Sequence, residues 1–407
     1  MVTIRSHFVA ATLLLLVPGS ALAAGPPQEP DTGGGQTGVL GLGTSGELKR
    51  RTGALDRLPR KTCAAVDRGL DWLARHQRPD GAWDADGFGS LCADEPCGGP
   101  GPKDGDVRAT ALALLALTGG AQSLRDGEHA DAVRAGVAFL RRQQDAESGA
   151  IGRAETAPGL EIAPVPPALA LETHALATAA LCDACALTRD PILAPSCRAA
   201  VEHLVTAVEG SRADGDRAAG EGGSAQGRPV AATDRARTER DLPAGAIRWL
   251  PPVVAILRDA EFTVPADAVG AMVASLRAEG AEGAEGAELR PMAVALGLRL
   301  LPAGAEIDGR RAAIAAGLTP EGLQPLVADP AERWCAAWLL RELDDAARQP
   351  LERALDAAIL ETRGSLSGCI GGSFPPVAGL DGGRVEATAL ALLAIEARAG
   401  NEPLDRD

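Results

Sequence analysis

Two kinds of apolar pattern alternate along the chain from about residue 62 onward. In the first kind, apolar residues recur at i, i+4 and i+7, as Val66, Leu70 and Leu73 do, and charged residues lie on the opposite face. This spacing predicts amphipathic helices that bury one face only. The pattern occurs in the segments 63–77, 132–144, 197–210, 266–280, 310–318 and 351–364.

The second kind of segment is apolar on nearly every side, so each such helix must be covered all round. These segments span 109–119, 173–187, 246–257, 291–301, 332–343 and 386–400. Two of them, VRATALALLALTG and RVEATALALLAIEARAG, are near copies, which indicates an internal repeat. One-sided helices that alternate with enclosed ones predict an all-α fold. We expect an α/α toroid of about six helical hairpins, with an inner and an outer ring.

The ends of the chain and two internal stretches lack this pattern. Arg5, the apolar run 8–17 and the small-residue site Ala21-Leu22-Ala23 predict a cleavable secretory signal at residues 1–23. The mature protein is then exported, to the periplasm or the extracellular space. The full division is a flexible Gly/Pro-rich lead-in at 24–61, the toroid at 62–400 with low-complexity insertions at 211–243 and 278–288, and a tail at 401–407.

The formal charge of −15 is spread without a basic stripe, so nucleic acid is not expected as a partner. No apolar run is long enough to span a membrane. Eight cysteines in an exported chain favour disulfides. The candidates are Cys92 with Cys97, which share one Gly/Pro-rich loop, and Cys182 or Cys185 with Cys197 across a turn. Eight cysteines allow about 105 pairings, so the connectivity stays open.

The segment from Gln77 to Trp83, QRPDGAW, resembles the QW motif of the prenyltransferase/squalene oxidase repeat family. That family includes terpenoid cyclases and protein prenyltransferase β-subunits, which are α/α toroids, and the likeness is greatest to exported squalene-cyclase-like proteins. We expect Gln77, Gly81 and Trp83 to form a structural clasp between neighbouring hairpins. Two further copies are degenerate, with Ile151 or Phe374 in place of the tryptophan.

The resemblance to cyclases implies a proton-donating Asp-x-Asp-Asp string and a cavity lined with aromatic rings. The nearest string here is Asp104-Gly105-Asp106, followed by Arg108, which we expect to hold these carboxylates ionised. The simpler role of Asp106 is to cap the helix that follows. Few aromatic residues are available for a cavity, and the candidates are Trp249, Trp334 and Trp338. Three rings are too few to guide a polycyclisation.

Zinc-dependent prenyl transfer, also implied by the resemblance, finds no support in the ligand spacing. His174, Cys182 and Cys185 share one helical stripe, but His174 and Cys182 would lie about 12 Å apart. We therefore expect no metal and no cofactor.

The absence of tyrosine excludes a tyrosine-dependent polysaccharide lyase, and Gly368-Cys369-Ile370-Gly371 lacks the glutamine of a thioester motif.

The starts of the enclosed helices gather polar residues at one end of the predicted toroid. Glu172, His174 and Glu386 join Asp104 and Asp106 there, which predicts a polar, acidic mouth. A cationic or polyhydroxylated small molecule would suit it. His174 is either a ligand contact or a hydrogen-bonded residue at the helix start.

These observations favour an exported, non-catalytic squalene-cyclase-like toroid that serves as a binding or scaffold module at the cell envelope. Its partner would be a small molecule or an envelope protein. The alternative is a reduced terpenoid-cyclase-type enzyme that acts on an isoprenoid through Asp104 and Asp106.

Overall fold

The computed structural model describes residues 45–93, 95–152, 167–220, 249–283, 291–301, 329–341, 343, 345–363, 367–376 and 382–399. Within these residues the chain forms twelve α-helices and one short 3-10 helix, and no strand. The all-α prediction is therefore confirmed. The proposed signal at 1–23, the tail at 401–407 and the expected helix at 310–318 lie outside the described residues.

The two sequence patterns give two classes of helix. The one-sided class comprises α2 (Arg60–Arg75), α4 (Ala130–Arg142), α6 (Ala194–Gly220), α10 (Ala266–Gly283) and α15 (Asp345–Glu361). The enclosed class comprises α3 (Asp106–Gly119), α5 (Pro167–Thr188), α9 (Leu250–Asp259), α11 (Pro291–Arg299), α14 (Pro330–Leu340) and α16 (Gly383–Ala399). In α3 every residue from Arg108 to Thr118 is buried, and α14 is buried along its whole length.

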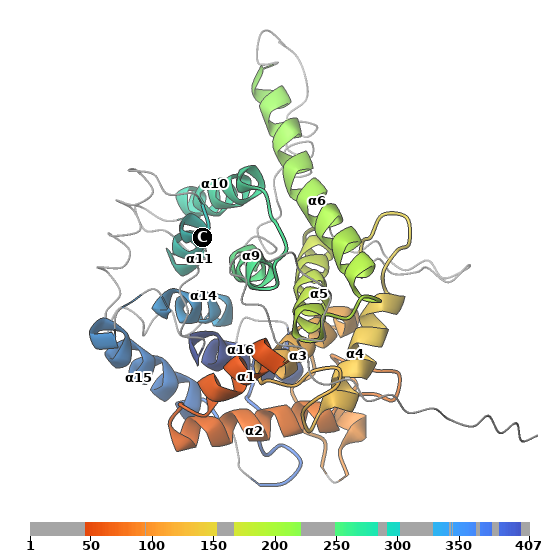
Figure 1. The fold of residues 1–407 in the computed structure, drawn as a ribbon, viewed down its shortest axis with the longest axis vertical. Coiled ribbons are helices and arrows are strands. Elements are labelled where there is room, and N and C mark those ends of the chain that lie inside the picture. Colours follow the sequence, from red (N-terminus) through yellow and green to blue (C-terminus); the bar gives the residue numbers. More distant parts are fainter. Residues whose placement is uncertain are drawn as a thin grey trace, which may run out of the picture. The chain divides into compact units, whose positions relative to one another are not determined.

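The enclosed helices contact one another in a sequence that returns to its first member. Helix α3 packs on α5, α5 on α9, α9 on α11 and α14, α14 on α16, and α16 again on α3 (Figure 1). The one-sided helices cover them: α4 packs on α3 and α5, α6 on α5, α10 on α11, α15 on α14 and α16, and α2 on α16 and α3. Each amphipathic helix thus buries its apolar face against an enclosed neighbour.

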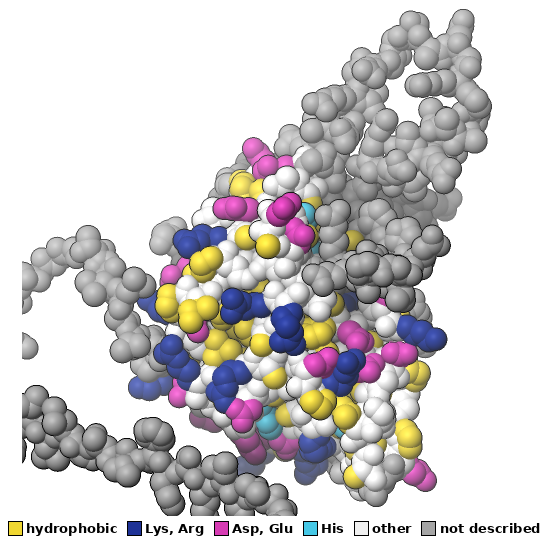
Figure 2. All heavy atoms as spheres, turned by 90° about the vertical axis from the view of Figure 1, so that its right-hand side faces the viewer, with side chains coloured by type: hydrophobic (Ala, Val, Ile, Leu, Met, Phe, Trp, Pro, Cys, Tyr) yellow, Lys and Arg dark blue, Asp and Glu magenta, His cyan; other side chains and the backbone are white. Residues whose placement is uncertain are grey.

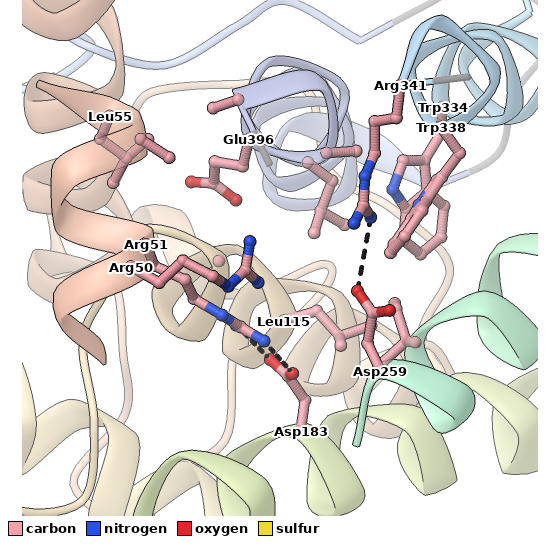
Figure 3. Close-up of a pocket in the computed structure, with 16 residues that line it drawn as sticks. Arg50, Arg51, Leu55, Leu115, Asp183, Asp259, Trp334, Trp338, Arg341 and Glu396 are labelled. Atoms are coloured by element: carbon pink, nitrogen blue, oxygen red, sulfur yellow. Dashed lines mark hydrogen bonds and ion pairs between the residues drawn. The ribbon is translucent and has the colours of Figure 1, made fainter. Parts of the chain in front are cut away.

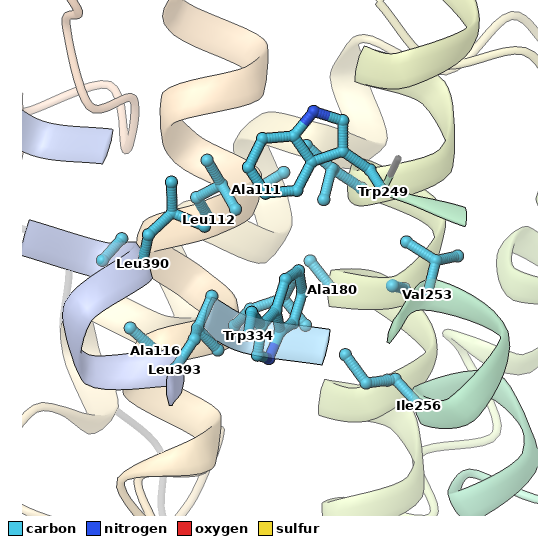
Figure 4. Close-up of a cluster of buried hydrophobic side chains, with 14 of the residues drawn as sticks. Ala111, Leu112, Ala116, Ala180, Trp249, Val253, Ile256, Trp334, Leu390 and Leu393 are labelled. Carbon is cyan, nitrogen blue, oxygen red and sulfur yellow. The ribbon is translucent and has the colours of Figure 1, made fainter. Parts of the chain in front are cut away.

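Aliphatic and indole side chains fill the space between the enclosed helices (Figure 4). Leu112, Val253 and Leu390 are buried there beside the rings of Trp249 and Trp334, whose centroids are 6.3 Å apart. Alanine supplies much of the remaining surface of these helices, which allows their backbones to approach closely. The interior is therefore largely packed with side chains.

The segment 77–83 clasps three helices together. The Gln77 side chain donates to the Gly81 carbonyl at 3.0 Å and to the Ala132 carbonyl of α4 at 2.9 Å. The buried Trp83 ring donates from Nε1 to the Leu73 carbonyl of α2 at 2.8 Å. Its backbone N–H donates to the Thr110 hydroxyl of α3 at 2.9 Å.

The degenerate copies repeat this geometry. Gly81 has a positive φ of 91°, and a Cβ there would overlap a backbone carbonyl of α4. Gly149 and Gly372 also have positive φ. A Cβ at Gly149 would overlap a backbone carbonyl of α6, and one at Gly372 would overlap a backbone carbonyl of α2. The backbone N–H of Phe374 donates to the Thr388 hydroxyl at 3.0 Å, as that of Trp83 does to Thr110. The last clasp in the sequence therefore grips α2, the first one-sided helix.

Three segments expected to be loops contain helix. Helix α1 (Ser45–Leu55) lies inside the segment treated as a flexible lead-in, and it packs on α16. Helix α6 continues to Gly220 and α10 to Gly283, so the beginnings of both expected insertions are helical. Their charged and alanine-rich composition favours helix.

Basic, acidic and hydrophobic side chains all occur on the face shown in Figure 2. Among the described residues, every helix is either too short or too polar to cross a membrane, in agreement with the sequence-based expectation.

Candidate functional site

A cavity of about 70 Å³ lies where α1 meets the C-terminal halves of the enclosed helices (Figure 3). We call it the central pocket. A water molecule needs about 10–15 Å³ of such volume, so the pocket holds a few waters or a small ligand group. Its apolar wall is formed by Leu55, Leu115, Ile256, Trp334, Trp338 and Leu393, and its polar wall by Arg50, Arg51, Asp183, Asp259, Arg341 and Glu396.

Arg51 of α1 anchors that helix over the pocket. Its guanidinium donates two hydrogen bonds to Asp183, at 2.6 and 2.9 Å, and one to the Thr118 carbonyl at the end of α3, at 3.0 Å. Burial opposes its charge, but the carboxylates of Asp183 and Glu47 outweigh burial and raise the pKa of Arg51. A cation also suits this end of the enclosed helices, where the helix dipoles are negative.

A second ion pair also belongs to the polar wall. Arg341 Nη1 lies 3.3 Å from Asp259 Oδ2, and the guanidinium carbon sits 4.5 Å from the centroid of the Trp338 ring. On the lining as a whole, three arginines face two aspartates and Glu396. Glu47 also pairs with Arg50 and Arg51, so the three arginines are balanced by three carboxylates when Glu396 is protonated.

Glu396 is a buried carboxyl group, and neither of its side-chain oxygens has a hydrogen-bond partner among the described residues. Burial raises its pKa well above the usual value, with Asp183 adding to that effect and Arg51 opposing it. One of its oxygens lies against Gly119, where a side chain would collide with it. Because burial favours the neutral form of this carboxyl, Glu396 can donate a proton or a hydrogen bond into the pocket.

Glu396→Gln is expected to change how stability depends on pH. A carboxyl with a raised folded-state pKa contributes stability that is fully present below its unfolded-state pKa and is lost as pH rises through the folded-state pKa. The wild type should lose up to about 1.4 kcal/mol per pH unit relative to the variant above about pH 4.5. Urea unfolding of both proteins at several pH values measures this difference, and parallel curves would contradict it.

The opposite end of the enclosed helices holds other predicted ligand candidates, among them Trp249 and Glu386, and the space between them is only about 10 Å³. Arg108 Nε lies 3.1 Å from Glu172 and Arg108 Nη2 lies 2.8 Å from Glu386, and all three side chains are buried. The Arg108 guanidinium also lies over the Trp249 ring, at 5.6 Å. The expected open, acidic mouth is therefore filled by an arginine from α3, which removes the argument for a cationic ligand at this end.

Asp104 and Asp106 are also placed differently from the expectation. Asp104 is exposed, and Asp106 accepts from the Ala85 backbone N–H at 2.9 Å and from Arg78 at 3.4 Å. No side chain caps the start of α3. Burial raises the pKa of Asp106, and the Ala85 N–H together with Arg78, not Arg108, opposes that rise. Neither aspartate lines the central pocket.

His174 belongs to the second clasp. Its Nδ1 accepts from the Ile151 backbone N–H at 3.0 Å, so Nε2 carries the proton and donates to the Ala200 carbonyl at 3.0 Å. Burial, with the adjacent His203, lowers its pKa to about 3. Of the two roles considered for His174, the structure shows the hydrogen-bonded one. His174 accepts from the Ile151 N–H as Thr110 accepts from the Trp83 N–H in the first clasp.

The cysteines expected to pair are brought together without bonds between them. The Cys197 thiol contacts Cys182 and Cys185, and the Sγ atoms of Cys92 and Cys97 are 3.3 Å apart. A disulfide requires about 2.05 Å, and all eight cysteines are free. The disulfides stay predictions.

Sequence reasoning missed Glu396 and Arg51. Glu396 was detectable as the lone acid in the largely apolar string ALALLAIEARAG, where a buried charge is costly and a neutral carboxyl is expected. Trp334 and Trp338 do line the pocket, whereas Trp249 lies at the closed end. Searches of protein-family models, curated proteins and solved structures found no match to this chain.

Proposed function

We propose that this chain is an exported α/α toroid of the squalene-cyclase-like repeat kind that binds a small molecule in its central pocket and does not cyclise polyenes. The closed order of contacts among the enclosed helices and the threefold recurrence of the clasp support the toroid and the family resemblance. The packed interior is the observation that carries the functional proposal. About 70 Å³ of free space is far too little for a long isoprenoid chain.

The chemistry of the lining narrows the ligand. Indole and aliphatic groups form one wall, and the arginines with a protonated Glu396 present hydrogen-bond donors on the other. This combination suits a small, partly apolar molecule with an acceptor group such as a carbonyl, hydroxyl or carboxylate. The ligand is therefore expected to be neutral or anionic.

A pocket-filling pair of variants tests the proposal. Ala54 is buried and lines the pocket, whereas the adjacent Gly53 has open space where a side chain would be added. Native mass spectrometry of the purified full chain should find a small bound molecule, which Ala54→Leu displaces and Gly53→Leu retains. Equal occupancy in both variants, or cyclic products from squalene or oxidosqualene, would overturn the proposal.

The neutral Glu396 carboxyl beside Trp334 and Trp338 supports a second candidate, an enzyme that protonates a small substrate in the same pocket. In that enzyme Glu396 replaces Asp104 and Asp106 as the acid. If the molecule found in the pocket is converted by the wild type, Glu396→Gln should abolish the conversion and leave binding in place. A purely binding role predicts no conversion by either protein.

A further inference from the structure

Four potential metal ligands from three distant segments converge beside α2. They are His76 at the end of α2, Cys92 and Cys97 in the loop after the 3-10 helix at Phe88–Leu91, and Cys369 in the last clasp. One ligand atom from each lies within 4.8 Å of the others. His76 Nε2 is 3.4 Å from Cys92 Sγ, 3.5 Å from Cys97 Sγ and 3.4 Å from Cys369 Sγ.

These separations fit a tetrahedral zinc ion. Zinc bonds of about 2.0–2.1 Å to nitrogen and about 2.3 Å to sulfur place N and S about 3.5 Å apart, and two sulfurs about 3.8 Å apart. The three N–S distances agree with this geometry. The Cys92–Cys97 separation of 3.3 Å is shorter, and a small rotation of either side chain opens it. The Cys92-x4-Cys97 spacing is also typical of zinc ligands.

His76 is oriented by its neighbours. Its Nδ1 lies 2.7 Å from the Trp72 carbonyl, to which it donates, so the unprotonated Nε2 faces the three sulfurs. The ring stacks on Trp72 at 4.2 Å and meets the edge of Phe88 at 5.9 Å. A metal-ligating histidine is usually held in place by a hydrogen bond from its other ring nitrogen, often to a backbone carbonyl.

The surroundings of the thiols also suit a cation. The Cys97 backbone N–H donates to Cys92 Sγ at 3.3 Å, as backbone amides do to thiolates. A divalent ion bound here would hold its thiol ligands deprotonated. One such ion and three thiolates leave a single negative charge, and the guanidinium of Arg384, bonded to the Gly98 carbonyl at 2.9 Å, lies beside it.

We propose that His76, Cys92, Cys97 and Cys369 bind one zinc ion that ties the first hairpin to the last. Four protein ligands fill a tetrahedral zinc ion, so the site is structural. His76 and Cys369 are 293 residues apart in sequence, and the ion therefore closes a very long chain segment. This site is incompatible with the Cys92–Cys97 disulfide, which would remove two of its four ligands.

Metal analysis of the full chain tests the proposal. Protein purified under reducing conditions and supplied with Zn²⁺ should retain one zinc ion per chain. Cys369→Ser should weaken zinc binding by more than about 100-fold, since loss of an outer-shell contact alone costs about 10–100-fold. The control is Cys63→Ser: Cys63 is partly buried like Cys369, but its thiol donates to the Leu55 and Leu58 carbonyls, and this variant should retain the metal.

Cobalt substitution gives a second readout that does not require Cys369→Ser to fold. Co²⁺ should produce the visible spectrum of a tetrahedral thiolate site, and Cys369→His should keep the metal with weaker sulfur-to-cobalt absorption. The proposal is overturned if the wild type binds no Zn²⁺, if Co²⁺ is six-coordinate, or if Cys369→Ser binds as the wild type does. It is also overturned if protein taken from its native compartment lacks zinc and carries a Cys92–Cys97 disulfide by mass spectrometry.

Discussion

Trp83→Ala is expected to lower the free energy of unfolding by about 3–5 kcal/mol. The indole is fully buried between α2, α3 and α4, and its removal leaves a cavity at their junction. The Leu73 carbonyl also loses its hydrogen bond from Nε1. Urea unfolding followed by circular dichroism measures the change.

Trp83→Phe is the matched variant. Phe374 occupies the equivalent position of the last clasp, so a phenyl ring fits the backbone geometry there. The variant keeps most of the apolar area and loses the hydrogen bond, and we expect it to cost about 1–3 kcal/mol. If Trp83→Ala were no more costly than Trp83→Phe, the clasp would not hold the hairpins together as described.

Arg108→Met is expected to destabilise the fold by about 3–5 kcal/mol, because it leaves two buried carboxylates without their shared cation. The arginine bonds Glu172 of α5 and Glu386 of α16, and so it joins three enclosed helices. Unfolding at neutral pH measures the loss. The exposed pair of Arg134 and Asp131 provides the control, for which Arg134→Met should cost only about 0–1 kcal/mol.

A triple variant distinguishes the loss of the ion-pair attraction from the cost of keeping two buried carboxylates without Arg108. Arg108→Met combined with Glu172→Gln and Glu386→Gln removes both carboxylates together with the cation. Replacing a whole buried ion network is often nearly neutral, so the triple variant should recover most of the stability lost by Arg108→Met alone. A triple variant less stable than the single one would show that the network itself supplies the stability.

The helices were predictable from the sequence because burial imposes a period on it. The one-sided spacing of Val66, Leu70 and Leu73, and the apolar run of α3, each determine how many sides of a helix must be covered. Gly81 and Trp83 were predictable as a clasp for a similar reason, since a positive φ and a large buried ring constrain the residue type.

The pairing of side chains was not predictable, because it depends on which helices become neighbours. Arg108 is near Asp104 and Asp106 in sequence, but the fold turns it toward Glu172 and Glu386. The closeness of His76 and Cys369 was not predictable for the same reason, because only the contact of the last clasp with α2 brings them together. Closeness in sequence suggested the wrong partners for Arg108. The large separation of His76 and Cys369 in sequence hid their cluster.

The grip of the last clasp on α2 has a consequence for how the molecule tolerates truncation. An open stack of repeats can shed a terminal unit and keep the rest folded, because each unit touches only its two neighbours. Here α16 packs on both α2 and α3, so among the described helices the last is also a neighbour of the first. Removing the final hairpin strips cover from the first, and the whole assembly should melt as one cooperative body instead of fraying from its end.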